Sequence, residues 1–148
     1  MPEEQELLLT RVFDAPPGLV FDAWTDPAQV ALWWGPTGFE APYAELDVRP
    51  GGAWRTCIRS EEHGELWSRG VYREVDRPRR LAFTFAWEEP EGVPGDEMGI
   101  TVTFAAEDGG KTLMTFRQRL IGTEERRDSE AAGWSECFDK LADALAGR

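Results

Sequence analysis

The sequence predicts an α+β domain in which a curved antiparallel sheet of six or seven strands is wrapped around a long C-terminal helix. The first observation is that short alternating runs of apolar and polar residues, separated by turns rich in Gly and Pro, recur from about residue 39 to residue 120. The second is that the apolar residues of 123–148 follow the period of an α-helix. A chain of 148 residues is expected to form a single domain over 1–148.

The residues before 39 are predicted to form one strand and two short helices. Residues 7–14 read as a strand, and the prolines at 16–17 end it, because proline cannot donate to a sheet ladder but suits the start of a helix. An Asp-Pro pair at 26–27 supplies an N-cap and a first-turn proline for the second helix. Trp33 and Trp34 follow. Adjacent indoles on a helix end cannot face the same way, so we expect one to be packed and the other to form a rim or lid.

The strands predicted after these helices are joined by turns, most of which contain Gly or Pro. They are 39–48, 53–60, 66–75, 81–87, 98–104 and 112–120. Pro42 marks the first of them as an edge strand or a bulge, because it removes a ladder donor. Alternation of large apolar residues with small residues is clearest in 81–87. The segment 88–97, which contains two prolines and two glycines, is expected to be a mobile loop.

The C-terminal helix is predicted from a single apolar stripe. Its members, spaced at i, i+4, i+7 and i+11, are Trp134, Phe138, Leu141 and Leu145. Charged residues occupy the other side, where Glu136 and Lys140 have the spacing of a favourable i,i+4 ion pair. A helix with such an aromatic stripe needs a broad apolar surface, and the predicted strands supply one.

A cavity between the sheet and this helix is the main candidate for a functional site. Seven Trp and eight Phe are many rings for a small core, and surplus rings often line an apolar pocket. The expected lining is Trp54, Thr56, Ile58, Phe83, Phe85, Trp87, Ile100, Val102, Met114 and Phe116 from the sheet, with Trp134, Phe138 and Leu141 from the helix. Such a cavity favours a flat or hydrophobic small molecule. The alternative is that these side chains interlock at native packing density and leave no void.

Three polar side chains are candidates for chemistry in that cavity. The alternation of 66–75 is ambiguous, and one of its two faces places Tyr72 and Glu74 inward. An inward Glu74 would lie in a partly apolar cleft, which suits a general acid or base. The alternative is that Glu74 pairs with an arginine such as Arg55 or faces water. Gln118 is expected either to orient a ligand or to satisfy a backbone group. Catalysis therefore stays an open question.

Charge and composition disfavour several classes of function. A net charge of −12 argues against nucleic acid and anionic membranes as partners, because both attract basic surfaces. No stretch has the apolar length of a membrane span, and the first residues are not those of a signal peptide, so a cytoplasmic location is expected. Cys57, Cys137 and the single histidine, His63, are too few and too far apart for a zinc site. We therefore expect no metal and no cofactor.

Six short motifs occur in an order that resembles a known family. They are Arg-Val-Phe-Asp-Ala-Pro at 11–16, Val-Phe-Asp-Ala-Trp-Thr-Asp-Pro at 20–27, Trp-Trp-Gly-Pro-Thr-Gly-Phe at 33–39, Asp-Val-Arg-Pro-Gly-Gly at 47–52, Gly-Val-Tyr-Arg-Glu at 70–74 and Gly-Trp at 133–134. This set resembles the activator of heat-shock protein 90 ATPase homologue-like family of the START-like (SRPBCC) superfamily. The resemblance implies the helix-grip fold, with a pocket between the sheet and the C-terminal helix.

Members of that superfamily include ligand carriers and polyketide cyclase-like proteins, so the resemblance leaves three hypotheses for function. The first is binding of a hydrophobic or aromatic small molecule. The second is a cyclase-like or hydratase-like enzyme that uses the same pocket, with Glu74 or Tyr72 as acid or base. The third is a protein-binding module of the chaperone-activator type, which is less expected because no counterpart of the eukaryotic co-chaperone's amino-terminal domain is found in this sequence. An edge strand or an exposed indole such as Trp33 would support a homodimer.

Overall fold

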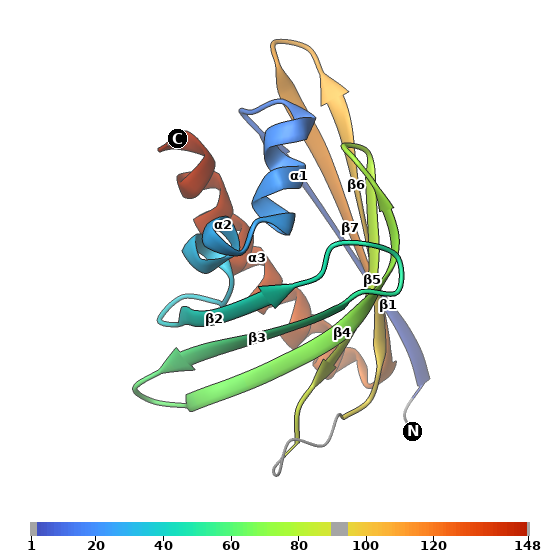
Figure 1. Cartoon of the computed structure of the whole chain (residues 1–148). Helices are drawn as coiled ribbons and strands as arrows, with labels where there is room; N and C mark the ends of the chain where they lie inside the picture. Colours follow the sequence, from blue (N-terminus) through green and yellow to red (C-terminus); the bar gives the residue numbers. More distant parts are fainter. Residues whose placement is uncertain (1–2, 90–94, 148) are drawn as a thin grey trace.

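The computed structural model describes residues 3–89 and 95–147, and this part of the chain forms a seven-stranded antiparallel sheet and three helices. The elements in chain order are β1 (Glu3–Phe13), α1 (Pro17–Thr25), α2 (Pro27–Trp33), β2 (Glu40–Leu46), β3 (Ala53–Ser60), β4 (Gly64–Asp76), β5 (Arg80–Trp87), β6 (Met98–Glu107), β7 (Lys111–Gly122) and α3 (Glu124–Ala146). Figure 1 shows the sheet curving around α3, with α1 and α2 on the same side. The predicted α+β helix-grip fold is confirmed. The middle of the expected 88–97 loop lies outside the described residues.

The order of strands brings the two ends of the chain together. It is β1-β7-β6-β5-β4-β3-β2, so the first strand pairs with the last. That pairing runs along the whole of β1, from Glu3 opposite Gly122 to Phe13 opposite Thr112. The strands from β2 to β7 follow one another as a meander, because connections of ten residues or fewer are too short for the crossover that parallel neighbours need. β1 and β2 form the two edges of the sheet.

Two of the helices begin at the capping residues that their sequences supply. At the start of α2 the Asp26 carboxylate accepts a hydrogen bond from the Ala28 amide at 3.0 Å. At the start of α3 the Thr123 hydroxyl accepts one from the Arg126 amide at 3.1 Å. None of the helices within residues 3–89 and 95–147 has both the length and the apolar content that crossing a bilayer requires.

Helix α3 is held against the sheet by both apolar and polar contacts. Its buried residues are Trp134, Cys137, Phe138, Leu141 and Leu145, which include the whole predicted stripe. Beside the stripe, Arg11 of β1 donates a hydrogen bond to the Ser135 hydroxyl at 2.9 Å and pairs with Asp139 at 2.9 Å. The position of α3 along the first strand is therefore fixed by a polar contact as well as by burial.

Among the described residues, six aromatic rings surround the indole of Trp24 at the centre of the core. They belong to Trp33, Trp34, Phe83, Phe116, Trp134 and Phe138, at centroid distances of 4.7 to 6.3 Å. Offset and edge-to-face contacts of this kind add to the stabilisation that burial provides. Most of the space between the sheet and α3 is thus filled by interlocking side chains.

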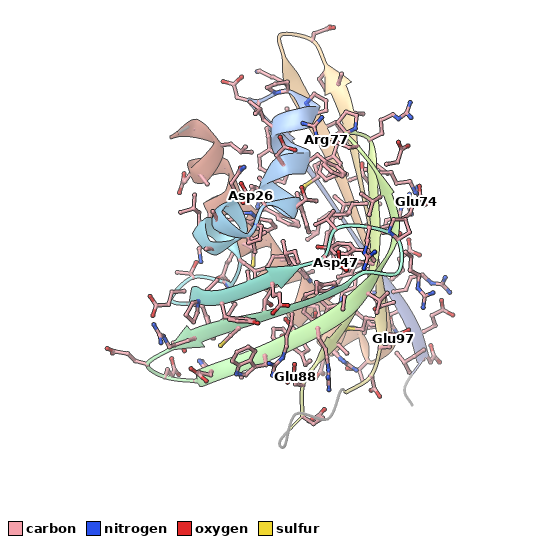
Figure 2. All side chains as sticks on the ribbon, viewed as in Figure 1. Asp26, Asp47, Glu74, Arg77, Glu88 and Glu97 are labelled. Carbon is pink, nitrogen blue, oxygen red and sulfur yellow. The ribbon has the colours of Figure 1, made fainter. Side chains whose placement is uncertain are left out.

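A β-bulge in β4 decides which of its side chains face the interior. Tyr72 is opposite Phe83, whereas Glu74 is opposite Ala82, so β4 contains one extra residue between the two pairs. The bulge leaves Tyr72 buried and turns Glu74 to the outer face of the sheet, where it pairs with Arg80 at 3.0 Å (Figure 2). The alternative in which Tyr72 and Glu74 both face inward is wrong, because the extra residue inverts the alternation between them.

Both indoles of the adjacent tryptophan pair are buried. Trp33 ends α2, and its Nε1 donates to the Ala23 carbonyl at 2.9 Å. Trp34 has already left the helix, and its extended backbone (φ −70°, ψ 128°) brings its ring against those of Trp54 and Trp134. The expectations of an exposed rim or lid and of an exposed Trp33 are therefore wrong. A homodimer through an edge strand stays a prediction. The change in backbone conformation between the two residues lets both rings face the core.

Candidate functional site

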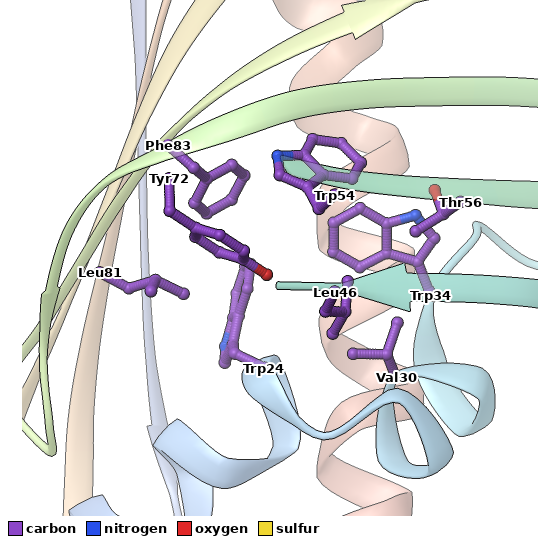
Figure 3. Close-up of a pocket in the computed structure, with 9 residues that line it drawn as sticks. All are labelled: Trp24, Val30, Trp34, Leu46, Trp54, Thr56, Tyr72, Leu81 and Phe83. Carbon is purple, nitrogen blue, oxygen red and sulfur yellow. The ribbon is translucent and has the colours of Figure 1, made fainter. Parts of the chain in front are cut away.

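Two of the cavities lined by described residues share the side chain of Trp34, and the inner of these two is very small. Its volume is about 20 Å³, which is room for about one water molecule. Its lining residues are Trp24, Val30, Trp34, Leu46, Trp54, Thr56, Tyr72, Leu81 and Phe83. Figure 3 shows the Tyr72 hydroxyl pointing into the space between these side chains. A cavity of this size cannot hold an organic ligand.

The larger of these two cavities, which we call the α3 groove, has a volume of about 190 Å³ and lies between α3, strands β3–β5 and the 34–39 segment. Its lining residues are Trp34, Gly35, Pro36, Phe39, Ile58, Leu66, Phe85, Trp87, Ser129, Glu130, Gly133, Trp134 and Cys137. Most of these side chains are apolar. Because a dry apolar cavity of about 150 Å³ is sufficient to bind benzene, the α3 groove has room for one aromatic ring.

Trp34 is the wall between the two cavities, since its indole lines both of them. The ring packs edge-on against Trp54, at a centroid distance of 6.0 Å, and against Trp134, at 5.3 Å. These contacts hold the indole across the inner end of the α3 groove. The depth of the groove is therefore set by a residue of the 34–39 segment rather than by the sheet.

Two side chains of α3 hold this segment in place. The Lys140 ammonium donates to the carbonyls of Gly35 and Phe39, at 2.8 and 3.1 Å. The Glu136 carboxylate accepts a hydrogen bond from the Thr37 amide at 2.9 Å. Burial lowers the pKa of Lys140, as expected for a cation that has lost part of its water. The two residues that have the spacing of an i,i+4 ion pair thus both bind the wall of the groove.

We expect Lys140→Met to loosen the 34–39 segment and to lower the free energy of unfolding by about 1–2 kcal/mol, because two carbonyls lose a charged donor. Amide hydrogen exchange within the segment is expected to become several-fold faster. The matched control is Lys111→Met, which removes the exposed lysine at the start of β7 and is expected to leave that exchange unchanged. Equal exchange rates in the two variants would show that Lys140 does not hold the segment.

Gly133 keeps the α3 groove open from the helix side. It lies within α3 and lines the groove, and a Cβ placed on it would meet no heavy atom within 4 Å. Neither the helical backbone nor a close neighbour therefore requires glycine here. Glycine inside a helix costs about 1 kcal/mol relative to alanine. The chain thus has a less stable helix at a position that borders the groove, where a large side chain would narrow it.

A chain of hydrogen bonds links Trp134, at the base of the groove, to Glu130. Glu130 carries the one carboxylate among the described residues that line the groove. The Trp134 indole donates to the Gln118 side-chain oxygen at 2.9 Å, and the Gln118 amide donates to the Glu130 carboxylate at 3.2 Å. The same amide lies 3.0 Å from the sulfur of Met98. Gln118, which was expected to bind a ligand or a backbone group, is buried and bound to other side chains.

The acid and base candidates named from the sequence are not brought together. Tyr72 lines the inner cavity, and burial raises the pKa of its hydroxyl, so the hydroxyl stays protonated at neutral pH. Glu74 lies on the opposite face of the sheet. Arg55, which was the partner considered for Glu74, instead pairs with Glu88 at 2.7 Å. This arrangement does not assemble an acid–base pair inside the protein.

The groove lining includes a free cysteine, Cys137, but its environment keeps the thiol unreactive. Burial raises the pKa of its thiol to about 12, so the thiol is protonated at neutral pH and is a poor nucleophile.

His63 stacks on Phe39, with 5.5 Å between the ring centroids. Over residues 3–89 and 95–147, no group of three or more His, Cys, Asp or Glu side chains is placed to hold a metal ion.

The residues predicted to line a cavity fall into four groups. Trp54, Thr56, Tyr72 and Phe83 line the inner cavity, and Ile58, Phe85, Trp87 and Trp134 line the α3 groove. Ile100, Val102, Met114, Phe116, Gln118, Phe138 and Leu141 are buried in the core and line neither cavity. Glu74 lies on the outer face. The predicted set thus mixes groove residues with the packed core behind them.

The sequence reasoning missed the half of the groove that the 34–39 segment and the flank of α3 provide. Pro36 and Phe39 lie in a segment whose path depends on contacts with α3, so no local pattern reveals their position. Glu130 and Gly133 lie beside the apolar stripe rather than on it. One signal was available in the sequence. Gly133 is a glycine inside a strongly periodic helix, and such a glycine often indicates a packing or functional role for that face of the helix.

Comparison with other proteins places this geometry in a family. The model described as Activator of Hsp90 ATPase homolog 1-like protein matches residues 14–146. No curated protein matches the sequence. A solved structure from Chromobacterium violaceum is 26% identical, with a TM-score of 0.82 over 95% of this chain and 97% of that chain. The structure of an AHSA1 protein from Silicibacter pomeroyi is also 26% identical, with a TM-score of 0.84 over 96% and 98% of the two chains.

A more distant solution structure, from Arthrobacter aurescens, shares the fold at 20% identity, with a TM-score of 0.84 over 100% of this chain and 92% of that chain. The shared fold is typical of ligand-binding and polyketide-cyclase-like proteins. The family match covers the helices α1 to α3 and the strands β2 to β7, and the similar structures cover at least 95% of this chain. The chain therefore belongs to the Activator of Hsp90 ATPase homolog 1-like family of the START-like (SRPBCC) superfamily.

Proposed function

We propose that this protein binds an apolar small molecule containing a single ring in the α3 groove. The observation that carries the proposal is an apolar groove of about 190 Å³ left open beside a core whose other rings interlock. Concave spaces lined mostly by apolar and aromatic side chains are typical sites for small ligands. Gly133 leaves room on the helix side of this groove, at a position where glycine lowers helix stability relative to alanine. A space maintained in this way supports a role in binding.

The size of the groove sets both the size of the ligand and its affinity. Sites for drug-sized ligands are larger, roughly 300–1,000 Å³. A ring that buries about 150 Å² gains about 4 kcal/mol from leaving water, which corresponds to a Kd of about 1 mM. Tighter binding therefore requires polar contacts in addition to burial of the ring.

Binding is favoured over catalysis by the placement of the reactive groups. A cyclase-like or hydratase-like reaction needs a proton donor or acceptor beside the bound ligand. Neither Tyr72 nor Glu74 lines the α3 groove, and the Cys137 thiol is protonated there at neutral pH. Glu130 does line the groove, but it is the one carboxylate among the described lining residues, and no His, Lys, Arg or Tyr lines the groove with it. These positions suit a site that holds its ligand without changing it.

We place this function in the cytoplasm. Cys57 and Cys137 are both free and buried, which is the usual condition of cysteines in a reducing compartment. Burial raises the pKa of both thiols, so neither is readily oxidised. The net charge of −12 is consistent with a protein that stays dispersed in a crowded aqueous phase.

Titration of toluene into ¹⁵N-labelled protein, followed by amide chemical shifts, tests the proposal. We expect saturable shifts with a Kd of about 1 mM, concentrated in the 34–39 segment, in residues 129–137 of α3 and around Phe85. Toluene is a suitable probe because it has no polar group and can report only burial of the ring. Shifts centred on another part of the molecule, or none at saturation, would overturn the proposed site.

A further inference from the structure

We propose that the ligand of the α3 groove carries a hydroxyl or ammonium group that donates a hydrogen bond to the carboxylate of Glu130. This inference rests on the proposed binding function and adds the chemical class of the ligand. Among the described residues that line the groove, Glu130 is the only one with a charged side chain. It lies one helical turn before Trp134 and is half-buried. The groove therefore combines an apolar space for a ring with one anionic acceptor.

The Glu130 carboxylate is held in a defined place rather than left to move in solvent. Its Oε1 accepts a hydrogen bond from the Gln118 amide, and the Gln118 oxygen is bound in turn by the indole of Trp134. Gln118 and Trp134 are buried, so both anchors are rigid. An acceptor that is already positioned loses little entropy when a ligand donates to it.

Of the side chains in this hydrogen-bond chain, the Glu130 carboxylate has the most acceptor sites left for a ligand. A carboxylate has about four acceptor sites, and the contact with Gln118 uses one of them. The Gln118 side chain is occupied on both sides, because its oxygen accepts from Trp134 and its amide faces Glu130 and Met98. A ligand that reaches this part of the groove therefore meets an anionic acceptor, and a donor is the group that matches it.

An anionic ligand would find no counter-charge in the groove. No Lys or Arg is among its described lining residues. Arg126, one turn earlier on α3, donates to the Ile121 carbonyl at 2.8 Å and pairs with Asp96 at 3.7 Å. Lys140 is bound to the carbonyls of the 34–39 segment. The overall charge of −12 repels anions as well. The geometry thus selects single-ring alcohols, phenols or amines against carboxylates.

The test compares three single-ring probes of similar size, toluene, benzylamine and benzoate, by the Kd of each for the wild-type protein. We expect benzylamine to bind at least tenfold more tightly than toluene, because a hydrogen bond to a charged group contributes that much. Benzoate is expected to bind at least tenfold more weakly than toluene. Glu130→Gln keeps an oxygen for Gln118 but removes the charge, so the ratio of the toluene and benzylamine Kd values is expected to fall toward one.

The matched control is Glu74→Gln, which makes the same change of charge on the outer face of the sheet and is expected to keep the wild-type ratio. Toluene that binds in the groove as tightly as benzylamine would overturn the role of Glu130 and leave the proposed function standing. Failure of toluene to bind in the groove at all would overturn the proposed function, and this inference with it. Where a Glu130 variant folds poorly, the wild-type comparison of benzylamine with toluene is repeated at high salt, which screens the overall charge of −12 much more than a direct hydrogen bond. A benzylamine advantage that disappears at high salt would overturn the role of Glu130.

Discussion

Trp24→Ala is expected to lower the free energy of unfolding by about 4 kcal/mol, the range typical of a large buried aromatic residue replaced by alanine. Trp24 is 3% exposed and lies at the centre of the ring cluster that joins α1 to the sheet and to α3. The six surrounding rings come from α2, the residue that follows it, β5, β7 and α3, so they cannot all collapse into the space left behind. Urea unfolding at 25 °C, with the wild-type protein as reference, measures the loss.

A pair of milder variants separates the packing of these indoles from their hydrogen bonds. Trp33 Nε1 donates to the Ala23 carbonyl at 2.9 Å, whereas Trp24 Nε1 is buried and has no hydrogen-bond partner among the described residues. Substitution by Phe replaces the indole with a smaller phenyl ring at either position, but only Trp33→Phe removes a hydrogen bond. We therefore expect Trp33→Phe to be more destabilising than Trp24→Phe by about 1 kcal/mol. The opposite order would mean that Trp24 Nε1 is satisfied in solution.

Gly133→Leu is expected to weaken toluene binding at least tenfold, because the new side chain projects into the α3 groove and occupies the volume of the ligand. The same substitution is expected to raise the free energy of unfolding by up to about 0.8 kcal/mol, since leucine is a much better helix former than glycine. Because the variant is expected to bind toluene more weakly while being more stable than the wild type, a loss of binding cannot be attributed to a loss of stability. Amide shift titrations and urea unfolding of the same sample measure both.

Ala132→Leu is the matched control for this variant. Ala132 is the neighbouring residue of α3 and is exposed, so leucine there adds the same apolar side chain outside the groove. Toluene binding is expected to stay at the wild-type level in Ala132→Leu. A Gly133→Leu variant that still binds toluene as tightly as the wild type would show that the ligand site lies elsewhere.

The secondary structure could be predicted closely because its signals are local. The strand expected at 53–60 is β3 with the same bounds, and the stripe of α3 is buried as its period indicates. The two short helices begin at the proline-containing pairs that predicted them. Alternation, helical periodicity and capping all act between residues a few positions apart, so they are present in the sequence before any long-range contact forms.

The candidate site could be predicted only in part. Eight of the residues predicted to line a cavity do line one of the two cavities, but they are divided between a space for a single water molecule and the α3 groove. Alternation shows that a side chain such as Phe116 or Trp87 faces inward. It does not show whether the opposing residue fills the space in front of it. Phe116 meets the rings of Trp24 and Trp134, while Trp87 borders open space.

The amino-acid sequence by itself determined the order and type of the elements, the buried face of α3 and the family, because periodicity and short motifs carry that information. Only the tertiary structure decided that Glu74 faces outward, that Trp34 closes the inner end of the groove and that Glu130 and Gly133 border it. One extra residue in β4 reverses the side chains that follow it, and the filling of the interior depends on how rings from distant segments share one volume. Neither the bulge, which depends on the pairing of β4 with β5, nor the filling of the interior can be read from any single stretch of the chain.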